Sequence, residues 1–263
     1  MTTRRWQLAH GRYLDLGPKA VVVGILNVTP DSFSDGGLFI APGKALEQAR
    51  RMVKEGAAVI DVGGESTRPG FAPITAEEEQ GRVLPVIAAL AASGEALISV
   101  DTYREDTARR AVAAGAHIVN DVWGLQREPG IARVAAETGA GLIIMHTGRE
   151  RQKLPDVIED QFLFLRKSLE IARAANVADS QIVLDAGFGF AKETAAENLD
   201  LMARFSELQA LGYPLMAGTS RKSVILRLKG ADLFRVHDVA INVDALALTD
   251  AMLARETEPP PGP

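Results

Sequence analysis

The segment Val21-Val22-Val23-Gly24-Ile25-Leu26-Asn27 is a short apolar run that ends in a polar residue, and the same pattern recurs along the chain. Runs of this kind are typical of strands that are buried on both faces of a parallel sheet. The later runs end at Asp61, Asp101, Asn120 with Asp121, His146, Asp185, Ser220-Arg221-Lys222, and Arg235 with His237. Eight such runs, mostly separated by helical stretches, predict an α/β protein with a (β/α)8 barrel, or TIM barrel, whose chemistry lies at the carboxyl ends of the strands.

The length of the chain fits one such barrel, because it has 263 residues and barrels of this kind typically have about 250. We expect a single barrel domain over residues 1–256 and a disordered Pro-rich tail over residues 257–263. Residues 5–16 alternate weakly around a glycine, which predicts a short N-terminal hairpin at the barrel floor. Apolar residues at helical spacing, such as Ala45, Ala49 and Met52, predict helices packed on the outside of the barrel.

The composition excludes several classes of protein and of site. The formal net charge is −5 and no basic tract occurs, so neither nucleic acid nor a membrane surface is an expected partner. The absence of cysteine excludes disulfides, thiolate metal sites and thiol catalysis. No apolar run approaches the ~18 residues of a membrane span, and residues 1–6 lead into no signal-peptide core. We therefore expect a cytoplasmic protein.

The loops that follow the first two predicted strands are rich in glycine and small polar residues. They cover residues 29–37 and 63–70. Loops of this composition often close over ligands. Because they carry Asn, Asp, Thr and Arg side chains beside strand ends, we expect a functional role for them rather than inert surface.

Two longer motifs include these loops. Residues 24–37 read GILNVTPDSFSDGG, and residues 61–70 read DVGGESTRPG. They resemble the two signatures of the dihydropteroate synthase family, and shorter motifs continue the likeness at residues 99–102, 120–122, 185–190, 220–222 and 235–239. The resemblance spans roughly residues 20–253. It implies a pterin-binding barrel that joins p-aminobenzoate to 6-hydroxymethyl-7,8-dihydropterin pyrophosphate in folate biosynthesis and releases pyrophosphate.

A pterin presents an edge of neighbouring hydrogen-bond donors and acceptors. Carboxylates accept from N–H groups, and an amide both donates and accepts. Asp101, Asn120 and Asp185 supply this set from three predicted strands, and the resemblance places all three on the pterin. It also implies that Lys222 donates to the ring and that Met145 packs in the same pocket. A helix cap or a loop hydrogen bond would account for any one of the aspartates alone.

The pyrophosphate of the substrate needs hydrogen-bond donors and a cation. Arginine offers paired donors to phosphate oxygens, and the resemblance supports Arg68, Arg235 and His237 in this role, with Asn27 as the metal ligand. Mg²⁺ prefers oxygen ligands and keeps several waters, so the Asn27 carbonyl together with phosphate oxygens is a suitable shell. The sequence shows no carboxylate cluster for a cage built from protein alone, so we expect the metal to arrive with the pyrophosphate.

The expected reaction displaces pyrophosphate from a methylene group on the dihydropterin. Because negative charge develops on the leaving group, donors and Mg²⁺ near it lower the barrier. The attacking arylamine needs positioning more than deprotonation, so we expect no dedicated nucleophile and no covalent intermediate. The residues expected to carry catalysis are Arg68, Lys222, Arg235 and His237. Those expected to frame the p-aminobenzoate pocket are Phe33, Thr67, Arg68, Phe190 and Ser220.

The chain departs from the family pattern in two places. Ala186 follows Asp185 where the family usually has proline, which predicts a less rigid backbone at Asp185. Roughly twenty family residues have no counterpart between Lys222 and Lys229, either through a true deletion or because a stretch is missing from this sequence. The predicted seventh βα unit is therefore truncated over residues 223–232, which leaves the reach of Lys222 and an expected homodimer in doubt.

Two other functions stay open. One is a non-catalytic pterin-binding barrel, disabled by the shortened seventh unit, which would bind pterin without turnover. The other is a related barrel that transfers a methyl group from methyltetrahydrofolate to a corrinoid protein. That barrel shares the Asp/Asn/Asp set but would not need Thr67, Arg68, residues 220–222 or residues 235–237, all of which this chain has. For His146 we expect a structural hydrogen bond rather than catalysis.

Overall fold

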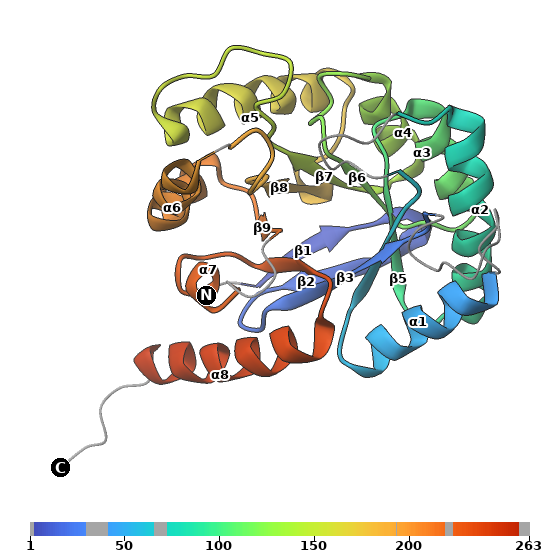
Figure 1. Cartoon of the computed structure of the whole chain (residues 1–263), viewed down its shortest axis with the longest axis horizontal. Helices are drawn as coiled ribbons and strands as arrows, with labels where there is room; N and C mark the ends of the chain where they lie inside the picture. Colours follow the sequence, from blue (N-terminus) through green and yellow to red (C-terminus); the bar gives the residue numbers. More distant parts are fainter. Residues whose placement is uncertain (1–2, 30–41, 66–72, 193, 219–222, 258–263) are drawn as a thin grey trace.

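The computed structural model describes residues 3–29, 42–65, 73–192, 194–218 and 223–257. Eight parallel strands form the centre of the molecule: β3 (Val21–Asn27), β4 (Val59–Gly63), β5 (Leu97–Asp101), β6 (Ile118–Asp121), β7 (Gly141–Met145), β8 (Ile182–Asp185), β9 (Leu215–Ala217) and β10 (Leu233–Val236). They pair in sequence order, and β10 closes the barrel by pairing with β3 (Figure 1). The predicted (β/α)8 barrel is confirmed.

Helices lie around the outside of this barrel (Figure 1). They are α1 (Pro42–Lys54), α2 (Ala76–Ser93), α3 (Glu105–Ala113), α4 (Gly130–Thr138), α5 (Val157–Ala174), α6 (Ala195–Arg204), α7 (Ser223–Leu228) and α8 (Val239–Thr257), with short 3-10 turns η1 (Ala9–Gly11), η3 (Asp179–Gln181) and η4 (Phe205–Leu211). Side chains cap some of their first turns. Thr75 accepts from the N–H of Glu78 (3.2 Å), and Asp156 accepts from the N–H of Ile158 (2.8 Å). Such caps satisfy N–H groups that have no partner within the helix.

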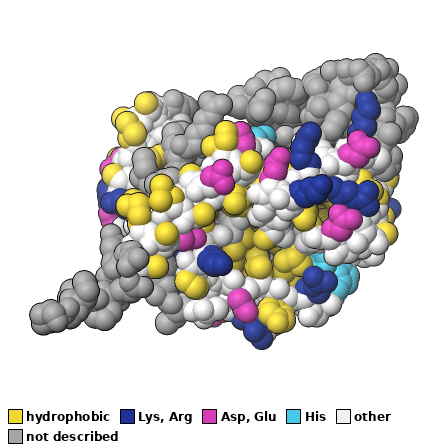
Figure 2. Space-filling model, turned by 90° about the horizontal axis from the view of Figure 1, so that it is seen from below, with side chains coloured by type: hydrophobic (Ala, Val, Ile, Leu, Met, Phe, Trp, Pro, Cys, Tyr) yellow, Lys and Arg dark blue, Asp and Glu magenta, His cyan; other side chains and the backbone are white. Residues whose placement is uncertain are grey.

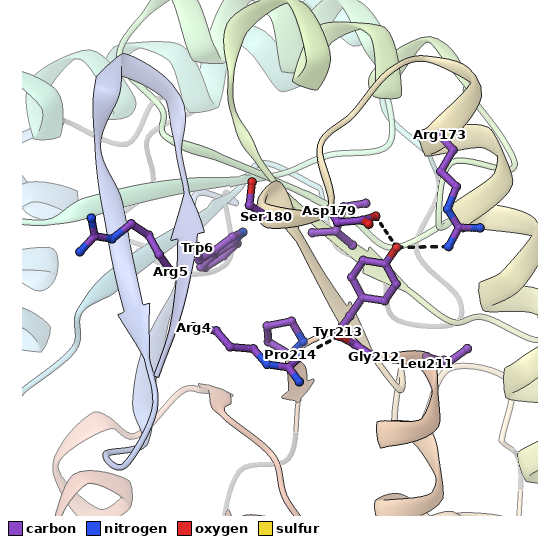
Figure 3. A pocket seen from close by; sticks show the side chains of 11 residues that line it. Arg4, Arg5, Trp6, Arg173, Asp179, Ser180, Leu211, Gly212, Tyr213 and Pro214 are labelled. Atoms are coloured by element: carbon purple, nitrogen blue, oxygen red, sulfur yellow. Dashed lines mark hydrogen bonds between the residues drawn. The ribbon is translucent and has the colours of Figure 1, made fainter. Parts of the chain in front are cut away.

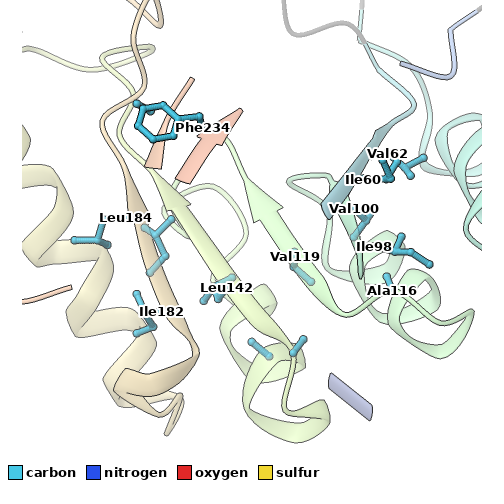
Figure 4. Packing of buried hydrophobic residues seen from close by; sticks show 14 of the residues in the cluster. Ile60, Val62, Ile98, Val100, Ala116, Val119, Leu142, Ile182, Leu184 and Phe234 are labelled. Carbon is cyan, nitrogen blue, oxygen red and sulfur yellow. The ribbon is translucent and has the colours of Figure 1, made fainter. Parts of the chain in front are cut away.

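Successive residues of each strand face the helices and the barrel interior in turn. Figure 4 shows part of the outward set, which packs against the helices and includes Ile60, Val62, Ile98, Val100, Val119, Leu142, Leu184 and Phe234. The inward residues near the amino ends of the strands form a second apolar cluster: Val21, Val23, Val59, Leu97, Ile118, Ile143, Val183, Met216 and Leu233. Because both faces are buried, these strands appear in the sequence as continuous apolar runs.

The predicted N-terminal hairpin is confirmed, with β1 (Arg4–Gln7) antiparallel to β2 (Tyr13–Leu16). Trp6 packs into the interior cluster and its Nε1 donates to the Gln181 carbonyl (2.7 Å). Figure 3 shows a cavity of about 480 Å³ between β1 and the segments that lead into β8 and β9. Polar groups around it bond to one another, for example Arg4 Nη1 to the Gly212 carbonyl (2.7 Å). These contacts fasten the hairpin to the amino-terminal end of the barrel.

Replacing Trp6 with Ala is expected to lower the free energy of unfolding by about 3–5 kcal/mol, because a large buried ring and its hydrogen bond are lost. A denaturant-unfolding curve measures this loss. Tyr13→Ala is the matched control, since Tyr13 lies on the other strand of the hairpin and is 51% exposed, whereas Trp6 is 1% exposed. The control is expected to change stability by less than about 1 kcal/mol. Equal losses in both variants would show that the hairpin does not close the barrel floor in this way.

The seventh βα unit is short, and one buried arginine holds it in place. Its helix α7 has six residues. Within it, the fully buried Arg227 donates from Nε to Asp250 of α8 (2.7 Å), from Nη1 to the Ala231 carbonyl (2.9 Å) and from Nη2 to the Pro18 carbonyl (2.9 Å). These bonds tie the short helix to α8 and to the segment before β3. The barrel therefore closes between β9 and β10 in spite of the short connection.

Within the described part of the chain, no helix has the combination of length and apolar character that crossing a membrane requires. Helix α8 ends at Thr257, and residues 258–263 of the expected Pro-rich tail lie outside the described residues. The domain boundary at residue 256 and the disorder of the tail stay predictions.

Candidate active site

A layer of polar side chains lies inside the barrel, at the carboxyl ends of the strands. Strand alternation turns the residues of the interior apolar cluster inward, and it turns the residues two and four positions further along the same strands inward as well. We call the resulting set the polar layer; its members are Asn27, Asp61, Ser99, Asp101, Asn120, Asp185 and Arg235. Strand register places Asp101 beside Asn120 and Asp185 beside Met145. The structure thus brings the three predicted pterin residues to one end of the barrel.

Arg235 joins two carboxylates of the polar layer. Its Nε donates to Asp61 Oδ2 (2.6 Å) and its Nη2 donates to Asp101 Oδ2 (2.5 Å). Asn120 Nδ2 donates to the same Asp61 oxygen (3.2 Å). Asp61 is fully buried, and a buried carboxylate is tolerated only when it is paired and hydrogen-bonded. Asp61 has no predicted role from the sequence, although it ends an apolar run as the predicted site residues Asp101 and Asp185 do.

Three buried oxygens of the polar layer have no hydrogen-bond partner among the described residues: Asp61 Oδ1, Ser99 Oγ and Asn120 Oδ1. Buried polar atoms are normally paired, and an unpaired one is costly. A ligand that brings N–H groups to this depth would satisfy the two acceptors on Asp61 and Asn120.

Burial also changes the acid–base behaviour of the polar layer. It raises the pKa of Asp101 to about 7, although the neighbouring Arg235 opposes this shift. It raises the pKa of Asp185 to about 6, although a backbone N–H and Arg235 both favour the carboxylate. Both groups therefore take up protons as the pH falls from slightly alkaline values towards 6.

The turn that follows β8 is held by buried side chains. The N–H of Gly187 donates to Asp185 Oδ1 (2.8 Å), and Gln161 Nε2 donates to the Ala186 carbonyl (2.9 Å). Gly187 has a φ of +61°, and a Cβ there would collide with the carbonyl oxygen of His146. A hydrogen bond to its carbonyl group thus restrains Ala186, and the less rigid backbone expected at Asp185 stays a prediction.

An apolar cluster adjoins the polar layer and contains two of the predicted site residues. Met145 and Phe190 lie in it together with Tyr103, Val122 and Trp123. The guanidinium of Arg149 stands 4.7 Å from the centre of the Phe190 ring. Rings and aliphatic side chains beside a set of convergent polar groups are typical of a site for a flat organic ligand.

Arg104 ties together the two sides of the second glycine-rich loop. Its Nη1 donates to Glu65 (2.7 Å) and to the buried Glu79 (3.0 Å), and its Nη2 donates to the Ile74 carbonyl (2.6 Å). Glu65 and Ile74 flank residues 66–72, which lie outside the described residues. The sequence contained no signal for this contact, because Arg104 belongs to the loop that leads into α3 and reaches the other loop only through the fold.

Asn27 is the predicted metal ligand and lies at the carboxyl end of β3. A Cβ at Gly63 would stand 3.7 Å from Asn27 Oδ1 and 3.8 Å from Asp101 Oδ2, so the absence of a side chain there leaves room beside two oxygens. In the described ranges, no group of three His, Cys, Asp or Glu side chains could hold a metal ion. A single amide oxygen fits Mg²⁺ if phosphate and water supply its other ligands.

Phe33, Thr67, Arg68, Ser220 and Lys222 lie outside the described residues. His237 is exposed and follows directly after β10, the strand that carries Arg235.

The comparisons with known proteins agree in one family. The family model described as "Pterin binding enzyme" matches residues 23–252. Dihydropteroate synthase of Bacillus subtilis strain 168 is 43% identical over 259 residues, which cover 89% of this chain and 89% of the relative. A structure of Xanthomonas albilineans dihydropteroate synthase with 4-aminobenzoic acid is 37% identical, with a TM-score of 0.88 over 98% of this chain and 100% of that chain. A structure of Yersinia pestis dihydropteroate synthase with a sulfonamide drug is 39% identical, with a TM-score of 0.85 over 94% of this chain and 98% of that chain. The chain belongs to the dihydropteroate synthase family of pterin-binding enzymes.

Proposed function

We propose that the polar layer, with the loops at residues 29–37 and 63–70, is the site where this dihydropteroate synthase joins p-aminobenzoate to 6-hydroxymethyl-7,8-dihydropterin pyrophosphate. The observation that carries the proposal is the arrival of Asp101, Asn120 and Asp185 from three strands at one end of the barrel interior. In barrels of this kind the chemistry lies at the carboxyl ends of the strands.

The pterin would lie against the polar layer. The carboxylates of Asp101 and Asp185 accept from the ring N–H and amino groups. Asn120 keeps its Oδ1 as an acceptor because its Nδ2 is bonded to Asp61. Lys222 would donate to the ring, and Met145, beside Asp185 in the strand register, would pack against it.

The pyrophosphate would extend towards Asn27 and the end of β10. Arg68, Arg235 and His237 would donate to its oxygens, and Arg235 is held in the polar layer by Asp61 and Asp101. Mg²⁺ would be bound by Asn27 Oδ1, phosphate oxygens and water, and it would withdraw charge from the departing pyrophosphate.

The p-aminobenzoate would bind next to the apolar cluster, framed by Phe190 and by Phe33, Thr67, Arg68 and Ser220. The Xanthomonas albilineans relative was solved with 4-aminobenzoic acid and the Yersinia pestis relative with a sulfonamide drug. Because both likenesses extend over nearly the whole chain, we infer that this chain takes the same aromatic amine and that sulfonamides inhibit it.

In the reaction, the methylene carbon of the pterin loses its bond to the pyrophosphate oxygen, which leaves with the electron pair. The amine nitrogen of p-aminobenzoate forms the new bond to that carbon and then releases a proton to solvent. The residues of the site hold the two reactants in line and stabilise the charge on the leaving oxygen. No covalent bond to the protein is needed.

Incubating the full chain with both substrates and Mg²⁺ is expected to release dihydropteroate and pyrophosphate in equal amounts. Removal of Mg²⁺ with a chelator is expected to lower the rate at least 10-fold, because a metal contributes several kcal/mol to such a step, and adding Mg²⁺ back restores it. Product mass and pyrophosphate release are measured together. Pterin binding without turnover would overturn the proposal in favour of a non-catalytic barrel, and methyl transfer from methyltetrahydrofolate to a corrinoid protein would point to the methyltransferase.

A homodimer and a cytoplasmic location stay predictions. Figure 2 shows hydrophobic side chains gathered on the side of the molecule where α8 lies. Large apolar side chains of this helix are exposed, among them Ile241, Leu248 and Met252, and Leu228 of α7 is exposed as well. A second copy of the chain that covers this face would bury them, although the short α7 limits how much surface the seventh unit can offer.

A further inference from the structure

A buried lysine lies beside the turn that carries Asp185. Lys192 is 5% exposed, and its Nζ donates to the Gly187 carbonyl (2.7 Å) and to His146 Nδ1 (3.2 Å). Two carboxylates of the surrounding segments pair with other cations, Asp160 with Arg151 and Glu197 with Lys153. Removing a charged lysine from water is costly, so its place in the fold requires compensation from the groups around it.

The imidazole of His146 is fixed by Asp160 so that it can accept from Lys192. Its Nε2 lies 3.0 Å from Asp160 Oδ2, which is the expected structural hydrogen bond. Burial raises the pKa of Asp160, but bonds from His146 and Arg151 lower it far below its usual range, so the carboxylate is ionised. An ionised carboxylate accepts from a protonated Nε2, and this leaves Nδ1 as the acceptor.

Two further observations fit this tautomer of His146. Burial lowers the pKa of His146 to about 4, so the ring is neutral and has one acceptor nitrogen above pH 5. Arg151 Nη2 also lies 2.9 Å from Nε2, but this contact cannot be a hydrogen bond while Nε2 carries its proton. Arg151 instead bonds to both oxygens of Asp160 (2.8 and 2.5 Å).

Gly187 connects this network to Asp185. Its N–H donates to Asp185 Oδ1 (2.8 Å), while its carbonyl accepts from Lys192 (2.7 Å). The buried ammonium group of Lys192 therefore holds Gly187, whose N–H orients the Asp185 carboxylate.

Charged residues from several strands and loops affect the pKa values of Asp185 and Lys192. Burial raises the pKa of Asp185, and Asp61 raises it further, whereas the Gly187 N–H, Arg235 and Lys192 lower it. Burial lowers the pKa of Lys192 to about 8, Asp185 and Asp160 raise it, and Lys153 and Arg151 lower it. Lys192 is thus a cation that, with Arg235, favours an ionised Asp185.

We propose that Lys192 is a positioning residue for the reaction: it fixes the Asp185–Gly187 turn through the Gly187 carbonyl and supplies positive charge beside the Asp185 carboxylate. This inference rests on the proposed function, in which Asp185 binds the pterin. His146 and Asp160 act through Lys192, as the outer members of a hydrogen-bonded chain orient the inner one.

Two variants separate the charge of Lys192 from its hydrogen bond. Lys192→Met removes both, and Lys192→Gln keeps a donor for the Gly187 carbonyl but removes the charge. For Lys192→Met we expect the KM for the pterin pyrophosphate to rise about 10-fold and the KM for p-aminobenzoate to stay within about twofold. Wild-type affinity for 6-hydroxymethyl-7,8-dihydropterin is expected to fall on acidification, when Asp185 is protonated. In both variants this fall is expected at a pH about one unit higher, because the positive charge of Lys192 no longer favours the Asp185 carboxylate.

Lys153→Met is the matched control. Lys153 donates to the Ala191 carbonyl (2.6 Å) and to Glu197 (2.8 Å), so it holds the same loop without touching Gly187 or His146. We expect it to leave both KM values and the pH profile of pterin binding unchanged. If Lys192→Met and Lys192→Gln both bind pterin with the wild-type pH profile, Lys192 is structural only and the inference is overturned.

Two further measurements distinguish a failure of the proposed function from a failure of the inference about Lys192. Asp185→Asn tests the proposed function itself, since normal pterin binding by that variant removes Asp185 from the site whatever Lys192 does. If neither Lys192 variant folds, the interaction between Lys192 and Asp185 is tested in folded Asp185→Asn protein. Its lysines are labelled with 13C at Cε and titrated by NMR. The Lys192 resonance is expected to titrate at lower pH than in the wild type, and an unchanged titration would overturn the inference.

Discussion

Asp185→Asn is expected to weaken pterin binding by at least 100-fold while leaving the folded protein at least as stable as the wild type at pH 8. The proposed role of Asp185 is to accept hydrogen bonds from the pterin. An asparagine replaces one acceptor oxygen by an NH₂ donor, and a donor facing a donor leaves both unpaired in a buried site. Sites built to bond a polar group discriminate against such changes by factors of 10² or more.

The effect on stability has the opposite sign. Burial raises the pKa of Asp185 to about 6, whereas an aspartate in an unfolded chain has a pKa of about 3.9. The folded state therefore binds this proton more tightly, and the associated stability is fully present below about pH 4 and lost as the pH rises through 6. At pH 8 the ionised carboxylate costs on the order of 2–3 kcal/mol, and a neutral asparagine does not carry that cost.

Unfolding curves at pH 8 and pH 4.5, together with titrations of the dihydropterin, measure both effects. The stability gain of the variant is expected to shrink towards pH 4.5, where the wild-type carboxyl group is protonated. Asp121→Asn is the control, because burial also raises the pKa of Asp121 to about 6 but its oxygens accept from the N–H groups of Trp123 (2.8 Å) and Leu125 (2.7 Å). The control should keep pterin affinity within about threefold. Unchanged affinity in Asp185→Asn would remove it from the pterin site.

The barrel could be predicted because its strands are buried on both faces. Val21–Asn27 and Gly141–Met145 show this as unbroken apolar runs, and Asp101 and Asp185 were candidates because they end such runs. Parallel strands bring their carboxyl ends to one side of the fold, so position along the chain was enough to group these residues.

Other parts of the site depend on contacts between segments that are distant in sequence. Asp61 and Arg235 are 174 residues apart, and nothing in either local sequence indicates that they form an ion pair. Lys192 belongs to a glycine-rich segment that has no regular periodicity, and its burial follows from the packing of the β8 turn against His146. Nothing in the sequence around Arg227 indicates that its side chain is buried, and only the fold shows that it fastens helix α7.

Arg235→Leu is expected to lower the rate of dihydropteroate formation at least 10³-fold and to lower the free energy of unfolding by about 3–5 kcal/mol at pH 8. Removing the guanidinium leaves the carboxyl groups of Asp61 and Asp101 buried without their cationic partner, and breaking a buried ion pair on one side typically costs this much. Activity is lost because Arg235, the proposed donor to the pyrophosphate, is absent and because the side chains of the polar layer are no longer held in place.

The stability loss is expected to depend on pH in a direction that identifies its cause. Burial raises the pKa of Asp101 to about 7 even with Arg235 present, and Arg235 opposes that shift, so the variant raises the pKa further. A carboxyl group whose pKa is raised by folding stabilises the folded state at low pH and loses this contribution as the pH increases. The free energy of unfolding of the variant is therefore expected to be lowest above pH 7 and to increase towards pH 5, where Asp101 is protonated. Denaturant unfolding at pH 5 and pH 8 measures the difference.

Arg235→Lys separates the charge from the geometry. Lysine keeps the positive charge but cannot reproduce the planar fork that bonds Asp61 from Nε and Asp101 from Nη2. We expect it to recover most of the stability at pH 8 and only a small part of the activity. If Arg235→Leu is as stable as the wild type at pH 8, the two carboxylates do not depend on Arg235. If Arg235→Lys is fully active, the site needs a cation at this position but not a fork, and the pyrophosphate must then be oriented by Arg68 and His237.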